Sequence, residues 1–225
     1  MAARVDHLVV AAASLEQGAA WCEATLGVTP GPGGEHPLMG THNRLLRIAT
    51  VDYPRAYFEI IAIQPGRQPQ RARRWFDLDD ESVRDTLARE GPRLLHFVAS
   101  VSDAAAGVAA WRGLGLERGE PVAASRMTPR GPLSWQITLR DDGQRLLDGL
   151  LPTLIEWGDA HPASALPESG VTLQSLTACH PQAATLRAAY EAVGLQGVAV
   201  KEGAADLCAV LDTPRGRVKL ASQGL

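Results

Sequence analysis

The sequence lacks the features that would point to a membrane or a nucleic-acid partner. No run of about 18 apolar residues is present, so we expect no membrane-spanning helix. Basic residues number 22 and acidic residues 25, and the resulting charge of −3 gives no electrostatic reason to expect nucleic acid or an anionic membrane as partner. The sequence therefore indicates a small molecule as the partner.

Cysteine is scarce, and the positions of the cysteines do not indicate a functional site. The three cysteines, Cys22, Cys179 and Cys208, lie far apart and are odd in number, so they give neither a disulfide framework nor a Cys-x-x-Cys site. The first residues run directly into an apolar stretch without a signal-peptide core. These absences predict a cytoplasmic protein with reduced thiols.

Four short apolar runs, each interrupted by one ionisable residue, are the main pattern that is present. They are short, bounded by turn residues and rich in β-branched or aromatic side chains, which predicts buried strands. The runs are 5–10, 56–63, 94–99 and 152–157, and their ionisable residues are His7, Glu59, His96 and Glu156 in that order.

A carboxylate on a buried strand face costs several kcal/mol unless something neutralises it. Two carboxylates together with two imidazoles predict one solution, a divalent cation bound by His7, Glu59, His96 and Glu156. Each residue taken alone also has an ordinary interpretation. A single His in a strand is usually a satisfied core or surface residue, and a single Glu usually faces solvent.

The order of these residues follows an internal repeat. Residues 1–64 read as strand, helix and then two or three strands, residues 65–92 as a connector, and residues 93–160 repeat the first pattern. In the first unit Ser14 is a plausible N-cap, and Gly27 is a natural stop for the helix that follows.

A degenerate third unit is expected in residues 170–225. It repeats the strand, helix and strand order but carries no His/Glu pair, so we expect it to be structural. Its apolar surface is expected either to pack on the first two units or to form a contact in a homodimer.

The repeat resembles the vicinal oxygen chelate superfamily, and in particular its glyoxalase-like domain proteins. The resemblance covers about residues 4–160, and the segments that carry it are Val5-Asp6-His7-Leu8-Val9, Gly40-Thr41-His42-Asn43-Arg44-Leu45-Leu46, Tyr57-Phe58-Glu59-Ile60-Ile61-Ala62, Leu133-Ser134-Trp135-Gln136 and Leu154-Ile155-Glu156-Trp157-Gly158-Asp159. It implies an α+β fold in which paired βαβββ modules form an incomplete barrel with a mixed sheet.

The same resemblance implies roles for individual residues. His7, Glu59, His96 and Glu156 occupy positions that bind the metal in glyoxalase I-like members. One of the two glutamates would also be the catalytic base, with Glu156 favoured by position and Glu59 as the other candidate. Asn43 is implied as a substrate contact, although it can equally be a turn residue that satisfies its own backbone. Nothing in the sequence marks a glutathione site.

Three functions remain open from the sequence. The first is an isomerase or lyase that uses a divalent metal (Zn, Ni, Co, Mn or Fe) to form an enediolate from a small vicinal-dioxygen substrate. The second is a metal-free protein that binds or sequesters a small molecule. The third is a non-haem iron dioxygenase using His7, His96 and Glu156, against which Glu59 argues as an extra ligand.

Overall fold

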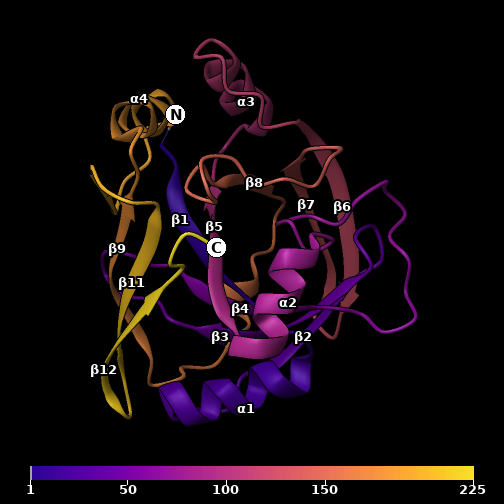
Figure 1. The fold of residues 1–225 in the computed structure, drawn as a ribbon. Coiled ribbons are helices and arrows are strands. Elements are labelled where there is room, and N and C mark those ends of the chain that lie inside the picture. Colours follow the sequence, from indigo (N-terminus) through magenta and orange to yellow (C-terminus); the bar gives the residue numbers. More distant parts are fainter. Residues whose placement is uncertain (1) are drawn as a thin grey trace.

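The computed structural model describes residues 2–225, which form one eight-stranded sheet, one four-stranded sheet and four α-helices (Figure 1). The elements of the larger sheet are β1 (Arg4–Ala11), β2 (Gly31–His36), β3 (Thr41–Arg47), β4 (Tyr57–Ile63), β5 (Arg93–Ser100), β6 (Glu120–Thr128), β7 (Gly131–Leu139) and β8 (Thr153–Trp157). Helices α1 (Leu15–Leu26), α2 (Glu81–Glu90) and α3 (Ala104–Arg112) belong to the same part of the chain.

The first module runs from β1 to β4, and β1 pairs with β4 in parallel. Helix α1 joins β1 to β2 and begins and ends where the sequence predicts. The Ser14 side chain accepts a hydrogen bond from the Gln17 backbone N–H, and Gly27 ends the helix with the left-handed φ of 77° that glycine adopts without strain. The helix covers the outer face of the sheet, against β3 and β4.

The second module repeats this arrangement, with β5 parallel to β8 and α3 after β5. The two modules join through antiparallel pairing of β1 with β5, giving the strand order β2-β3-β4-β1-β5-β8-β7-β6. The sheet is curved (Figure 1), and we use the term lumen for its concave side, which buried side chains fill. The predicted mixed α+β fold of paired βαβββ modules is confirmed.

The connector between the modules does more than link them. Trp75 and Phe76 are buried and belong to the core that fills the lumen, and their rings stack at 5.0 Å. Phe76 and Asp77 adopt left-handed φ angles of 59° and 57°, a costly backbone for two consecutive non-glycine residues. Arg145 holds this turn, since its Nε and backbone N–H both donate to the Asp77 carboxylate.

The C-terminal unit has the predicted order of elements but its own strand pairing. It comprises β9 (Thr172–Cys179), α4 (Ala183–Val193), β10 (Val198–Lys201), β11 (Asp206–Thr213) and β12 (Gly216–Ala221), in the sheet order β10-β9-β11-β12. Here β9 pairs in parallel with β10, the next strand, whereas β1 pairs in parallel with β4.

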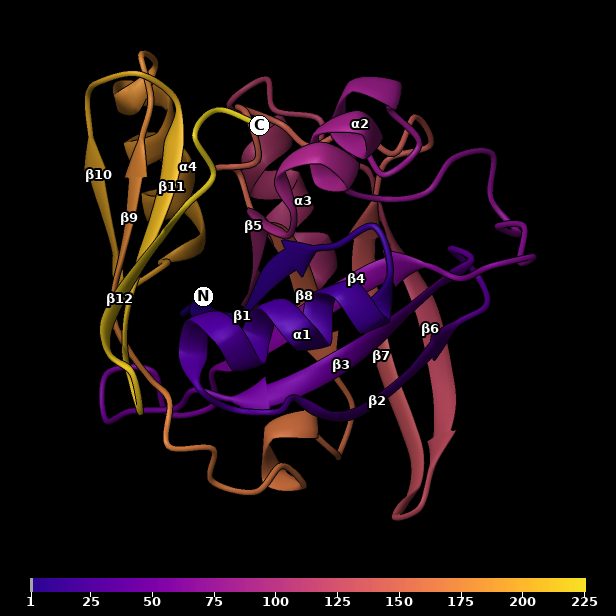
Figure 2. The ribbon, with the colours of Figure 1, turned by 60° about the horizontal axis from the view of Figure 1, so that its bottom comes forward.

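This unit packs against the outside of the first two modules (Figure 2). Leu173, Leu186 and Leu211 share one apolar core with Leu8 and Phe58 of the first module. Three further hydrogen bonds link the C-terminal unit to the first two modules. They run from Tyr53 Oη to Gly197 O, from Trp111 Nε1 to Ala189 O and from Tyr190 Oη to Leu150 O. The sequence left two expectations for this unit, packing on the first two modules or a homodimer contact, and the structure shows the packing on the modules.

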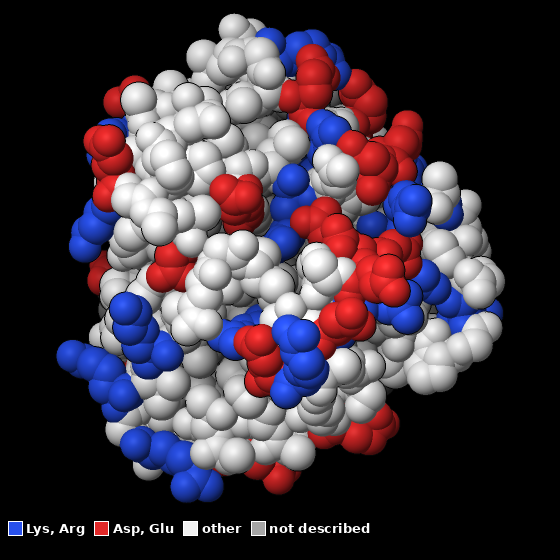
Figure 3. Space-filling view, viewed as in Figure 1, with Lys and Arg blue, Asp and Glu red and all other residues white. Residues whose placement is uncertain are grey.

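Charge is mixed on the face seen in Figure 3, where acidic side chains around α2 alternate with basic ones. Within residues 2–225, none of the helices is long and apolar enough to cross a lipid bilayer. The three cysteines are all free, Cys22 being buried in the core.

Candidate active site

The candidate site is a small cavity of about 30 Å³ inside the lumen, lined by residues of both modules. An adjoining groove of about 220 Å³ shares four of its wall residues and reaches the surface past the β2–β3 turn. The shared residues are His36, Trp75, Trp135 and Ile137. The cavity therefore adjoins a wider groove.

Glu59 is the buried carboxylate of this cavity, only 5% exposed. Asn43, on the neighbouring strand β3, donates a 2.6 Å hydrogen bond from Nδ2 to Oε1 of Glu59. His7 approaches the other oxygen, with Nε2 3.6 Å from Oε2. One carboxylate oxygen is thus held in place, while the other faces an imidazole without a close hydrogen bond.

Asp6 fixes the orientation of His7. The β1–β5 register shifts between Val5 and His7, and this irregularity leaves both Asp6 and His7 buried. The Asp6 carboxylate accepts hydrogen bonds from His7 Nδ1 at 2.7 Å and from Trp157 Nε1 and His161 Nε2 at 3.0 Å. Because Nδ1 donates to Asp6, Nε2 is the ring nitrogen that faces Glu59.

The three donors make Asp6 a stable buried anion. Burial by itself would raise the pKa of this carboxyl, but the hydrogen bonds from His161 and His7 hold the pKa well below its usual range. The tautomer of His161 is also determined, since its Nδ1 accepts from the Ala163 backbone N–H at 3.1 Å. Its Nε2 must therefore be the nitrogen that donates to Asp6.

His36, the last residue of β2, completes the polar wall. Its Nε2 lies 3.9 Å from Oε1 of Glu59 and accepts from Asn43 Nδ2 at 3.2 Å, and its Nδ1 meets Thr41 Oγ1 at 3.1 Å. Burial lowers the pKa of His36 to about 3, so the ring is neutral at ordinary pH. The orientation of the Asn43 amide is set by Gly34, whose backbone N–H donates to Oδ1 at 2.7 Å.

Glycine is required in β2 by this close approach. A Cβ added at Gly33 would clash with Asn43 Oδ1, and one added at Gly34 would clash with Arg126 Nη1. The Gly/Pro-rich segment 29–37 thus includes strand β2, and its lack of side chains makes room for two residues of the site.

His96 lies apart from the His7–Glu59 pair and has both ring nitrogens occupied. It is fully buried; Nδ1 donates to Gly149 O at 2.7 Å, and Nε2 accepts from the Thr153 backbone N–H at 3.0 Å. Thr153 Oγ1 also lies 3.0 Å from Nε2, and it accepts a hydrogen bond from Arg118. Burial, before any charge, lowers the pKa of His96 well below its usual value.

Glu156 does not lie in the cavity either. Its carboxylate accepts a 2.8 Å hydrogen bond from the backbone N–H of Ala104, the first residue of α3. Side chains alternate along β8, so Ile155 and Trp157 line the cavity while Glu156 faces the other side of the sheet. The structure therefore does not bring Glu156 to His7 and Glu59, and its implied roles as ligand and favoured base stay predictions.

The four predicted ligands therefore do not meet at one centre. Within the described part of the chain, no three His, Cys, Asp or Glu side chains are grouped so as to hold a metal ion. The donor set that does converge, from His7, His36 and Glu59, is bridged by the Asn43 amide. The residues present do not fit the four-ligand centre, or the His7, His96 and Glu156 set of an iron dioxygenase. Metal binding by the protein stays a prediction.

The sequence did not predict Asp6, which hydrogen-bonds to His7, or three residues that line the cavity: His36, Trp75 and Arg126. Asp6 had a usable signal, since a charged residue beside His7 in an apolar strand invites a carboxylate–imidazole pair. His36 lies in a Gly/Pro-rich stretch, and Trp75 and Arg126 lie in a connector and an exposed hairpin. Only the folded chain brings these three to Glu59.

Comparison with known proteins agrees with this fold. A solved hypothetical protein from Staphylococcus aureus superposes with a TM-score of 0.62 at 12% identity, covering 90% of this chain and 87% of that one. A variant of methylmalonyl-CoA epimerase from Streptomyces coelicolor gives 0.41 at 18% identity, covering 70% and 96%, and the epimerase from Mycobacterium tuberculosis gives 0.37 at 19%, covering 72% and 91%. No curated protein matches the sequence.

The paired modules and the family comparison together show to which family the chain belongs. The fold is that of the vicinal oxygen chelate superfamily. Residues 5–194 match the model of the glyoxalase-like domain family, and the chain belongs to that family.

Proposed function

We propose that the protein is a proton-transfer enzyme, an isomerase or lyase, which acts on a small substrate with two adjacent oxygens through an enediolate. The observation that carries this proposal is the Glu59 carboxylate, buried in a cavity with Oε1 held by Asn43 and Oε2 available. A carboxylate fixed in a water-poor cavity is suited to take a proton from carbon and return it.

The residues around Glu59 support this chemistry without a further group. Oε2 of Glu59 would accept the proton from a substrate C–H, while Asn43 keeps the carboxylate from turning away. His7, held by Asp6, presents Nε2 beside Oε2 and can take part in moving the proton. The aromatic walls exclude water from the intermediate. No step is assigned to a divalent ion, because the donor set does not fit the predicted centre.

A second function, metal-free binding of a small molecule, is favoured by a specific observation. The cavity contains buried polar groups without partners, which a bound ligand alone would satisfy. In that case the cavity would hold the ligand and Glu59 would make a contact but move no proton. Both functions have a small molecule as partner; the expected homodimer and cytoplasmic location stay predictions.

Hydrogen exchange separates the two functions. We would incubate the protein in D₂O with a panel of small 2-hydroxy acids, 2-oxo acids and dicarbonyls, and follow loss of C–H signals by NMR. We expect exchange with at least one compound, and a rate about 10²-fold lower or less in Glu59→Gln. Glu156→Gln, which leaves the cavity intact, should exchange at the wild-type rate.

Two results would contradict the proposal. Ligand-induced increases in melting temperature without exchange for any compound would leave the binding function in its place. Exchange that is equally fast in the folded Glu59→Gln variant would remove Glu59 as the base.

A further inference from the structure

Two hydrogen-bond donors in the wall of the candidate site have no acceptor. Nη1 of Arg126 and Nε1 of Trp75 are both buried from solvent and make no hydrogen bond within the described residues. Both side chains line the same cavity as Glu59. Buried donors in a folded protein are nearly always paired, so two unpaired donors on side chains that line one cavity point to a ligand that supplies the acceptors.

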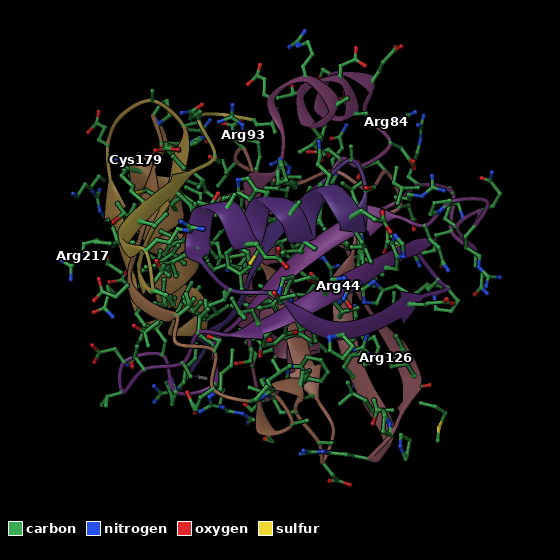
Figure 4. All side chains as sticks on the ribbon, turned by 90° about the horizontal axis from the view of Figure 1, so that it is seen from below. Arg44, Arg84, Arg93, Arg126, Cys179 and Arg217 are labelled. Carbon is green, nitrogen blue, oxygen red and sulfur yellow. The ribbon has the colours of Figure 1, made fainter. Side chains whose placement is uncertain are left out.

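Arg126 reaches the cavity from the second module. It lies on β6 opposite Leu133 of β7, which also lines the cavity. Its guanidinium lies across Gly34 of β2, where only glycine leaves space for it. Figure 4 shows Arg126 at the hairpin of β6 and β7, beside strand β2.

The charge of Arg126 is not used by the protein itself. Asn43, His7 and His36 are the polar neighbours of the Glu59 carboxylate, and within the described residues Arg126 forms no ion pair with Glu59 or another carboxylate. Beside burial, the charge of Arg126 contributes to the low pKa of His36, which places the guanidinium near the polar wall of the cavity. A guanidinium with a free N–H in a confined cavity is suited to bind a carboxylate or another anionic oxygen.

We propose that Arg126 and Trp75 form an anion subsite that binds the carboxylate of the substrate, and that the substrate is a small carboxylic acid with a second oxygen on its adjacent carbon. This inference rests on the proposed function, and it names the two vicinal oxygens as one of the carboxylate and one of the neighbouring hydroxyl. The inner cavity admits only the acid group and its adjacent carbon, so any tail of the substrate lies in the adjoining groove.

Every proton and electron pair in the proposed proton transfer is accounted for. The C–H bond at the carbon next to the carboxylate breaks, and the proton goes to Oε2 of Glu59. The electron pair moves into the carboxylate, giving an enediolate whose negative oxygens lie at Arg126 Nη1 and Trp75 Nε1. Return of the proton from Oε2 of Glu59 to the same face of that carbon restores the acid. No oxidant or reductant is needed.

Oxalate is a suitable probe, because it has two adjacent carbons each bearing anionic oxygen and has no C–H to react. We would measure oxalate binding by calorimetry with EDTA present throughout, so that no metal bridges it. We expect binding by the wild type, at least a 10-fold weaker affinity in Arg126→Met, and an intermediate affinity in Arg126→Lys. Trp75→Phe, which keeps a ring but removes the N–H, should weaken binding several-fold.

A matched control lies on the same hairpin. Arg130 is exposed and donates only to Ser164 O, so Arg130→Met should bind oxalate as the wild type does. Circular dichroism and melting temperature show whether Arg126→Met is folded, and Arg126→Lys keeps the test valid should that variant unfold. A neutral vicinal compound, dihydroxyacetone, should show no dependence on Arg126.

The outcomes separate this inference from the proposed function. Unchanged oxalate affinity in folded Arg126→Met or in Arg126→Lys, or no oxalate binding by the wild type in the presence of EDTA, would overturn the subsite, even where the Glu59 exchange result stands. Loss of oxalate affinity in Arg126→Met supports the subsite, and if no acid then exchanges hydrogen, the proposed enzyme function fails while the subsite stands.

Discussion

The two modules repeat one architecture but use its central strands differently. In the first module, Glu59 pairs with the residue two places after His7 in the parallel register of β1 and β4. In the second, the residue two places after His96 pairs with Thr153. Thr153 is therefore the structural counterpart of Glu59, and the second module has a neutral hydroxyl where the first has a carboxylate.

This difference gives the two histidines different roles, since His7 lies in the candidate site and His96 is part of the packed core. His96 has both ring nitrogens bonded within its own module, and Phe76 of the connector packs against it with ring centroids 5.1 Å apart. His7 is bonded at Nδ1 only and keeps Nε2 toward Glu59. A histidine at the same place in a repeat is thus structural where its partners satisfy it completely, and available for chemistry where they do not.

The largest effect that tests this comparison is expected from His96→Ala. The change leaves Gly149 O and Thr153 N–H without partners and opens a cavity, so we expect the free energy of unfolding to fall by about 4 kcal/mol. His7→Ala removes only one of the three donors to Asp6 and should cost about 1–2 kcal/mol. Urea denaturation of both variants measures the difference, and equal losses would show that the two histidines do not differ in role.

The pH dependence of stability is the next largest effect. Burial lowers the pKa of His36 to about 3 and that of His96 well below its usual value. Between these values and about 6.5 the unfolded chain binds protons that the folded chain does not, so stability must fall as the pH falls. We expect a loss of about 3 kcal/mol for the two groups together between pH 6.5 and pH 5.

Urea denaturation across this range tests the expectation. His36→Gln removes one of the two groups and should reduce the loss by about half. A wild-type free energy of unfolding that stays constant from pH 6.5 to pH 5 would contradict the view that both rings are buried in their neutral form.

The architecture was predictable from the sequence, because repeat order, strand periodicity and caps are local signals. The helix between Ser14 and Gly27 and the strands that carry His7, Glu59 and His96 appear where the sequence indicates. The pairing of the C-terminal strands was not predictable, since the order of elements is the same as in the first modules and pairing depends on contacts distant in sequence.

Only the part of the candidate site that lies in the first module was predictable from the sequence. His7, Asn43 and Glu59 come together because they lie on paired strands of one module. Glu156 does not join them, because side chains alternate along a strand and the boundary of β8 is not fixed by its sequence. Arg126 reaches the cavity across a hairpin, which no local pattern reveals.

The smallest expected effect comes from Glu156→Gln, and it tests the comparison from the opposite side. The carboxylate lies at the N-terminus of α3, where a negative charge stabilises a helix by about 0.3–1 kcal/mol, and Gln keeps an oxygen that can accept from Ala104 N–H. We expect a loss of about 0.5 kcal/mol, and a melting temperature lower by about 1–2 °C. Hydrogen exchange and oxalate affinity should both be unchanged, because this side chain faces away from the cavity. If Glu156→Gln instead abolished exchange while remaining folded, β8 would contribute a proton-transfer group, and the contrast between the central strands of the two modules would be wrong.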